Sequence, residues 1–269
     1  MENNKRPLVT KETLENCDCH IGLRFRYWNP KMKDFILNKE SGRYLFDTDK
    51  ISWFLGNAYD YILDLVKAGA DIMFVGVKNK NTSPIIMEAA SRVKALYLTQ
   101  RWLGGLLTNF KNISSNIKKL NELTDLLENP DLQEGYTKRE ILHFSKQKEK
   151  LEKFYGGIRN LQRLPNLLVV FNPVEDVIAV QEARKMNIPI IAISNTNTDP
   201  DNVDFVIPGN NSSTKSVYLI ANLLCDAIAQ VQGQAQLVAY KDMSEITIPE
   251  EYQQHYKFRS GERGTVSFI

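Results

Sequence analysis

The sequence has few cysteines and no long hydrophobic run, and each shortage argues against a class of protein. The chain of 269 residues has three cysteines, an odd number that argues against a disulfide framework. No apolar run approaches the roughly 18 residues that a membrane span requires. The N-terminal stretch MENNKRPLVTKETLEN lacks the apolar core of a secretory signal. We therefore expect a reduced, cytoplasmic protein with no membrane segment.

The signatures of common enzymes are also missing. There is no G-x-x-x-x-G-K-[ST] loop, and the first predicted strand is followed by Gly76 alone rather than by G-x-G-x-x-G. No G-x-S-x-G elbow is present. The stretch CDCH brings Cys17, Cys19 and His20 together, but structural zinc usually requires a wider cysteine spacing and a second ligand pair. These three residues are weak metal candidates, and we expect no catalysis, no metal and no cofactor.

Neither sign of charge is in large excess. The 34 basic and 32 acidic residues give a net charge of +2, so an affinity for polyanions must come from local clusters. Between residues 20 and 43, basic side chains alternate with aromatic ones. The basic residues are Arg24, Arg26, Lys31, Lys33, Lys39 and Arg43, and the aromatic residues are Phe25, Tyr27, Trp28 and Phe35. Cations contact phosphates and rings stack on bases, so this segment favours RNA, although charge-rich faces are normally just solvated.

Short apolar runs alternate with helical patterns along most of the chain. The runs at 71–77, 95–98, 167–171, 188–194 and 203–208 have no polar alternation, as is typical of parallel strands covered on both faces. Helical patterns lie between them, one ending at Gly69, one with Pro84 in its first turn, and one from Pro173 to Asn187. The sequence therefore predicts an α/β fold with a parallel sheet of about five strands.

One interval breaks the alternation. Between Leu98 and Leu167, apolar residues step by three and four in two long segments, and Thr137 with Glu140 reads as a capping box opening the second. We predict an antiparallel helical hairpin, or arm. The predicted parts are residues 1–105 and 159–230 for the α/β domain, 106–158 for the arm and 231–269 for a polar tail that orders only on a partner. A small β-hairpin is predicted over residues 35–46.

Five segments, in order, resemble the bacterial-type small-subunit ribosomal protein two family, the S-two family. They are RYWNPKMKDFI at 26–36, QRWLGGLLTNF at 100–110, FYGGIRNLQRLPNLLVV at 154–170, EARKMNIPIIAISNTNTDP at 182–200 and VDFVIPGN at 203–210. The similarity covers residues 13–230. One stretch departs from the family, which usually reads His-Phe-Gly-His where this chain has His20-Ile21-Gly22-Leu23.

The resemblance implies a flavodoxin-like sheet with a protruding coiled-coil arm. It also implies a structural role, as a monomer, on the solvent side of the small ribosomal subunit between head and body, near the mRNA exit. The implied partners are small-subunit (16S-type) rRNA, neighbouring small-subunit proteins and ribosomal protein one.

We expect RNA contacts from nine residues: Arg24, Arg26, Trp28, Lys31, Lys33, Arg43, Arg101, Lys118 and Lys119. The motif at 100–110 is expected to form the arm root, with Trp102 packing on the sheet, Gly104 and Gly105 turning the chain and Asn109 starting a helix. Two alternatives stay open. One is a small-molecule enzyme whose crevice uses Gly76, Asn195 and Asp199, and the other is a protein-only adaptor that docks through the arm.

Overall fold

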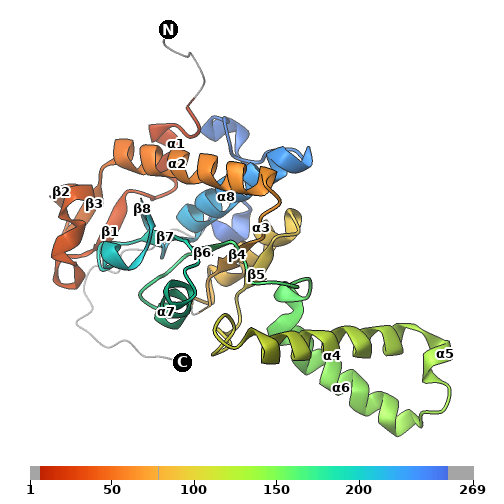
Figure 1. Cartoon of the computed structure of the whole chain (residues 1–269). Helices are drawn as coiled ribbons and strands as arrows, with labels where there is room; N and C mark the ends of the chain where they lie inside the picture. Colours follow the sequence, from red (N-terminus) through yellow and green to blue (C-terminus); the bar gives the residue numbers. More distant parts are fainter. Residues whose placement is uncertain (1–6, 78, 254–269) are drawn as a thin grey trace.

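A parallel five-stranded sheet forms the centre of the computed structural model, which describes residues 7–77 and 79–253 (Figure 1). The strand order is β5-β4-β6-β7-β8, and all four pairings are parallel. The strands are β4 Ile72–Val75, β5 Leu96–Leu98, β6 Leu167–Val170, β7 Ile190–Ser194 and β8 Phe205–Pro208. This is the flavodoxin-like order, with its switch point between β4 and β6. The predicted fold class is confirmed.

Alternate residues of the strands enter two separate cores. Along β4, Ile72 and Phe74 join the larger core, whereas Met73 and Val75 join the smaller core on the opposite face. All four β4 residues are buried. Because β4 is covered on both faces, every side chain along it enters an apolar core, which explains why its sequence contains no polar residue.

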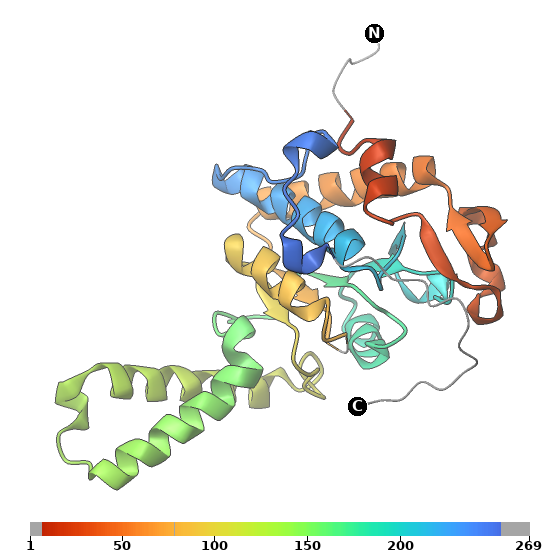
Figure 2. The ribbon, with the colours of Figure 1, turned by 180° about the vertical axis from the view of Figure 1, so that it is seen from behind.

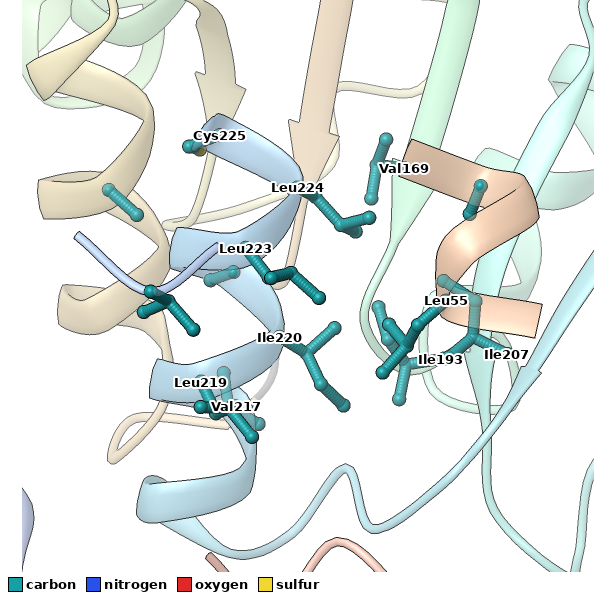
Figure 3. Close-up of a cluster of buried hydrophobic side chains, with 14 of the residues drawn as sticks. Leu55, Val169, Ile193, Ile207, Val217, Leu219, Ile220, Leu223, Leu224 and Cys225 are labelled. Atoms are coloured by element: carbon teal, nitrogen blue, oxygen red, sulfur yellow. The ribbon is translucent and has the colours of Figure 1, made fainter. Parts of the chain in front are cut away.

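Helices α2 (Thr48–Lys67), α3 (Ser83–Arg92) and α8 (Thr214–Gln232) cover the face of the larger core. Figure 3 shows Ile220 and Leu224 of α8 directed toward Val169 and Ile193 of the sheet. These four side chains are fully buried, and each such burial contributes about 2 kcal/mol. The predicted end of α2 is also confirmed, because Gly69 follows it with a φ of +76°.

Helix α7 (Val177–Lys185) lies on the opposite face. The predicted start of this helix at Pro173 is wrong. Residues 173–176 instead form a turn, in which the Asp176 N–H donates to the carbonyl of Asn172 and the Asn172 Oδ1 accepts from the Glu175 N–H. The turn brings the Asp176 carboxylate to the end of β4, where it accepts from the Val77 N–H at 3.3 Å.

Helices α4 (Phe110–Glu128) and α6 (Lys138–Tyr155) pack against each other and extend away from the sheet, with α5 (Pro130–Gln133) between them (Figures 1 and 2). We call this pair the arm. α4 buries Ile113, Ile117 and Leu120, whereas α6 has no buried residue. The predicted Thr137–Glu140 capping box is present. At the base of α6, Gly157 lies so close to Tyr97 of β5 that a Cβ would clash with the Tyr97 carbonyl.

A second, antiparallel sheet lies near the N-terminus, in the order β1-β3-β2. It comprises β1 Ile21–Arg24, β2 Ile36–Glu40 and β3 Arg43–Phe46, preceded by helix α1 Lys11–Asn16. The β2–β3 pair confirms the predicted hairpin. The segment around β1 covers the carboxyl ends of β7 and β8: the Asn29 N–H donates to the Thr196 carbonyl at 2.7 Å, and the Asn210 N–H to the Cys19 carbonyl at 3.0 Å.

The prediction of an unstructured tail beyond residue 231 is wrong for residues 234–253, and the rest of that tail lies outside the described residues. Val238, Ala239, Ile246 and Ile248 are buried in the larger core. Their apolar side chains are too widely spaced to show a helical or strand period, so the pattern gave no sign of this packing. Within residues 7–77 and 79–253, no helix has the length and apolar character needed to cross a membrane.

Candidate nucleic-acid interface

The N-terminal sheet carries a group that we define as the N-terminal basic cluster: Arg24, Arg26, Lys33 and Arg43. Arg24 and Arg43 lie opposite each other on β1 and β3. The guanidinium of Arg26 lies 4.7 Å from the centre of the Tyr27 ring. Arg24, Arg26 and Lys33 are exposed, whereas Arg43 is half-buried and donates to a carbonyl of β1 at 3.4 Å. Four predicted RNA-contact residues therefore lie on or beside one small sheet.

Aromatic rings lie beside this cluster and are arranged around Tyr44. The ring centres of Phe25 and Trp28 lie 4.9 and 5.0 Å from that of Tyr44, and the Lys39 ammonium lies 5.2 Å from the same ring. Trp28, predicted to contact RNA, is half-buried against Tyr44. Tyr27 is 51% exposed and so offers a ring face on which a base can stack.

Lys31 differs from the other predicted RNA-contact residues because two carboxylates already neutralise it. Its ammonium lies 2.9 Å from Asp199 Oδ1 and 2.6 Å from Asp201 Oδ2. The hydrogen bonds to Asp201 and Asp199 raise the pKa of Lys31 above its ordinary value. Asp199 also accepts from the Asp201 N–H, as in a tight Asx-type turn. Lys31 is thus a weaker candidate for a phosphate contact than Lys33.

The loop between β5 and α4 closes around one internal carboxylate, that of Glu182 on α7. Glu182 is 9% exposed. Its Oε1 accepts from the Trp102 indole N–H at 3.0 Å and from the Gly105 N–H at 2.8 Å. Its Oε2 accepts from the N–H groups of Leu107 at 3.0 Å and Thr108 at 3.3 Å. Glu182 therefore ties the arm root to α7.

These contacts set the charge state of Glu182. Burial alone would raise its pKa, but the hydrogen bonds from Trp102, Gly105, Leu107 and Thr108 outweigh burial and hold the pKa below its ordinary value. Backbone N–H groups before a helix are the usual grip for a phosphate. Here the Glu182 carboxylate already accepts from these N–H groups, so the loop is a structural contact between α7 and the arm and not a phosphate site.

Some of the residues predicted to form the arm root have the expected geometry, and others do not. Trp102 packs in the smaller core, and Gly105 has a φ of +82°, as a sharp turn requires. Gly104 has no positive φ and no atom within 4 Å of an added Cβ, so nothing here requires glycine. Asn109 precedes α4 as predicted, but its side chain makes no capping hydrogen bond. The Thr108 hydroxyl instead donates to Glu182 at 3.4 Å.

The remaining predicted RNA-contact residues lie at the arm. Arg101 is exposed at the root, between β5 and α4. On α4, Lys118 lies 3.8 Å from Glu122, whereas Lys119 has no ion pair among the described residues. The structure thus places the predicted contacts in two separate regions, the N-terminal sheet and the arm.

The weak metal candidates have no ligand-like arrangement. Cys17 and Cys19 are both buried, and the Cys19 thiol donates to the Cys17 carbonyl at 3.9 Å. Burial raises the pKa of the Cys17 thiol to about 12 and also raises that of Cys19, which disfavours the thiolates that zinc binds. Across the described part of the chain, no cluster of three or more His, Cys, Asp or Glu side chains is placed to hold a metal.

The crevice proposed for the small-molecule enzyme alternative is not formed by its three residues. Gly76 follows β4, whereas Asn195 and Asp199 follow β7, and β6 separates those two strands. Asn195 is fully buried and donates to Asn211, while Asp199 is paired with Lys31. The structure does not bring the three residues into one site.

Sequence reasoning missed two organising carboxylates, Glu182 and Asp226. Each is buried on a helix whose other buried residues are mostly apolar. Asp226 is fully buried on α8, lies 2.8 Å from Arg92, and accepts from the Leu237 and Val238 N–H groups at 3.0 and 2.7 Å. An acid within a mostly apolar helix segment was the available signal, because a buried charge needs partners.

Fold and site together define a doubly wound α/β protein with basic surface clusters and a loop before α4 whose N–H groups are occupied by the Glu182 carboxylate of α7. A profile of the family described as ribosomal protein S2 matches residues 14–231. The chain therefore belongs to the ribosomal protein S2 family, a family of structural ribosomal proteins and not of enzymes.

Three relatives illustrate the similarity, and each is named small ribosomal subunit protein uS2. The protein of Ureaplasma urealyticum is 43% identical over 247 residues, covering 92% of this chain and 70% of the relative. That of Mycoplasma genitalium is 43% identical over 265 residues, covering 97% and 93%. That of Thermobifida fusca is 41% identical over 223 residues, covering 83% and 76%.

Proposed function

We propose that the chain is a structural component of the small ribosomal subunit and binds small-subunit rRNA through the N-terminal basic cluster. Family membership carries the first part of the proposal. The second part is supported by Arg24, Arg26 and Lys33, which are exposed and have no ion pair with any described residue. Contacts from such cations to phosphates fix the position of a protein on RNA without reading its sequence.

The ion pairs of the described residues support an order of preference among the remaining predicted contacts. Arg101 and Lys119 are exposed and unpaired within the described chain, so they remain good candidates. Lys31 and Lys118 each lie near a carboxylate, which lowers the gain from a phosphate contact. The resemblance to the family favours a monomer between head and body near the mRNA exit, beside other small-subunit proteins and ribosomal protein one. A cytoplasmic location follows from this assignment.

Sedimentation tests the proposal. A cell lysate is separated on a sucrose gradient and the fractions are blotted for this chain. We expect it to migrate with small subunits and whole ribosomes and to be released only at high salt, because phosphate contacts weaken as salt rises. Nuclease digestion should move it to the light fractions. Finding the chain only in light fractions would overturn the proposal, and survival of its complex after nuclease would favour a protein-only adaptor.

A further inference from the structure

Three hollows around the base of the arm join into one surface, which we call the arm-root groove. The first hollow has a volume of about 700 Å³ and lies beyond the ends of β4 and β5. The second, of about 370 Å³, shares Arg101, Trp102 and Gly104 with the first. The third, of about 360 Å³, lies between α4 and α6 and shares Asn116, Phe154 and Tyr155 with the second. The three hollows therefore adjoin one another, from the sheet edge along the arm.

Unpaired cations line the arm-root groove. Lys80 and Arg101 border the first hollow, and Lys119 and Lys150 border the third. All four are exposed, and none has an ion pair or side-chain hydrogen bond with any described residue. Carboxylates line only the first hollow, and no carboxylate is among the residues lining the two hollows along the arm. In the first hollow Glu175 and Asp176 balance Lys80 and Arg101, so the match to a polyanion lies in the two hollows along the arm.

The groove also presents amides and aromatic rings. Asn109 and Asn112 are exposed in the second hollow, and their side chains make no hydrogen bond within the described residues. Phe154 and Tyr155 are half-buried and line both the second and third hollows. Free amides can bond to base edges and rings can stack on base faces, but a duplex hides those faces. Cations, amides and rings together favour a single strand.

We propose that the arm-root groove binds an unpaired strand of RNA. Lys119, Lys150 and Arg101 contact its phosphates, and bases stack at Phe154 and Tyr155. The assignment of this strand to rRNA rests on the proposed function. The proposal that the arm-root groove binds RNA is independent of that function. The groove is separate from the N-terminal basic cluster, and the affinity of the isolated full chain for RNA can be measured directly.

The test measures binding of the full-length protein to a fluorescent ten-nucleotide oligouridine by anisotropy. We expect the double variant Lys119→Ala/Lys150→Ala to bind about tenfold more weakly. The slope of log affinity against log salt should fall by about 1.4, because each phosphate contact to a single strand contributes about 0.7. The matched control is Lys111→Ala/Lys138→Ala, which removes one exposed lysine from each of the same helices but outside the groove. It should change affinity less than twofold.

Stacking has its own variant, Phe154→Leu, which should weaken oligouridine binding with an unchanged salt slope. Equal weakening by the groove and control doubles would overturn the proposal. So would binding of a ten-base-pair RNA duplex, or of a ten-residue polyglutamate peptide, as tight as that of oligouridine. The replaced lysines are exposed, and unchanged thermal melting curves will show that the variants fold.

The two proposals fail in distinguishable ways. A chain that sediments with small subunits but has no affinity for oligouridine overturns the arm-root groove alone. A chain that binds oligouridine through the groove but never sediments with small subunits supports the groove and overturns the ribosomal assignment.

Discussion

Glu182 is the side chain that accepts most of the hydrogen bonds at the arm root. Glu182→Gln preserves the shape but turns an acceptor oxygen into an NH₂ group that faces N–H donors. We expect the free energy of unfolding to fall by about 2–3 kcal/mol, measured by urea denaturation. The control is Glu175→Gln, an exposed carboxylate on the preceding turn, which should change it by less than about 0.5 kcal/mol. Equal urea-denaturation midpoints for the two variants would contradict a stabilising role of Glu182 at the arm root.

The lowered pKa of Glu182 also predicts a pH dependence. A carboxylate whose pKa is lower in the folded state than its unfolded value of 4.5 stabilises the fold fully above that value. This contribution is lost as the pH falls through the lower folded pKa. The stability difference between wild type and Glu182→Gln should therefore be constant from about pH 6 to 8 and narrow below about pH 4. A difference that does not change down to pH 3 would show that the charge of Glu182 is not what stabilises the loop.

The two glycines of the arm-root loop should respond differently to replacement. Gly105→Ala puts a Cβ on a residue with a φ of +82°, 3.2 Å from the Asn109 Cβ, and should cost about 1–2 kcal/mol. Gly104→Ala meets no atom within 4 Å and should leave the unfolding free energy within about 0.5 kcal/mol. Thermal or urea unfolding of the two variants side by side measures the contrast, and similar losses would refute it.

At the scale of elements, Asp226 on α8 holds the segment that follows that helix. Asp226→Ala leaves Arg92 without its carboxylate and frees the Leu237, Val238 and Ala239 N–H groups. We expect a loss of about 3 kcal/mol and faster hydrogen exchange at residues 237–239, read by mass spectrometry. Asp60→Ala, at an exposed position on α2, is the control. Unchanged exchange at these amides would contradict the assignment.

The strands were predictable from sequence because burial on both faces removes polar residues from them, as in β4 and β6. The start of α7 was not, because the turn at residues 173–176 depends on hydrogen bonds to Asn172 that no apolar period reports. β1 was missed because its four residues, Ile21–Arg24, include only one buried position and so form no continuous apolar run. Strands buried on both faces can be predicted from their apolar runs, whereas a turn fixed by the side chain of Asn172 leaves no such pattern.

At the scale of the whole molecule, sequence located the basic residues but not their partners. Lys31 and Asp199 are 168 positions apart, yet the fold brings them to 2.9 Å. Lys119 and Lys150 come from different helices and line one groove only because α4 packs on α6. A basic residue is a useful RNA candidate when the fold leaves it unpaired, and only the assembled chain shows which residues those are.

The net charge of +2 gives the molecule little long-range attraction for RNA, so binding must rely on such local clusters. Replacing Arg24, Arg26 and Lys33 together with Ala should lower occupancy on purified small subunits and leave unfolding unchanged. If all three contact phosphates of paired rRNA, the salt slope should fall by about 2.7, at about 0.9 per contact. The control removes three charges elsewhere in the described chain: Lys67, Lys185 and Lys241. Because both triple variants have the same net charge, equal occupancy would refute the local assignment and leave only a nonspecific effect of charge.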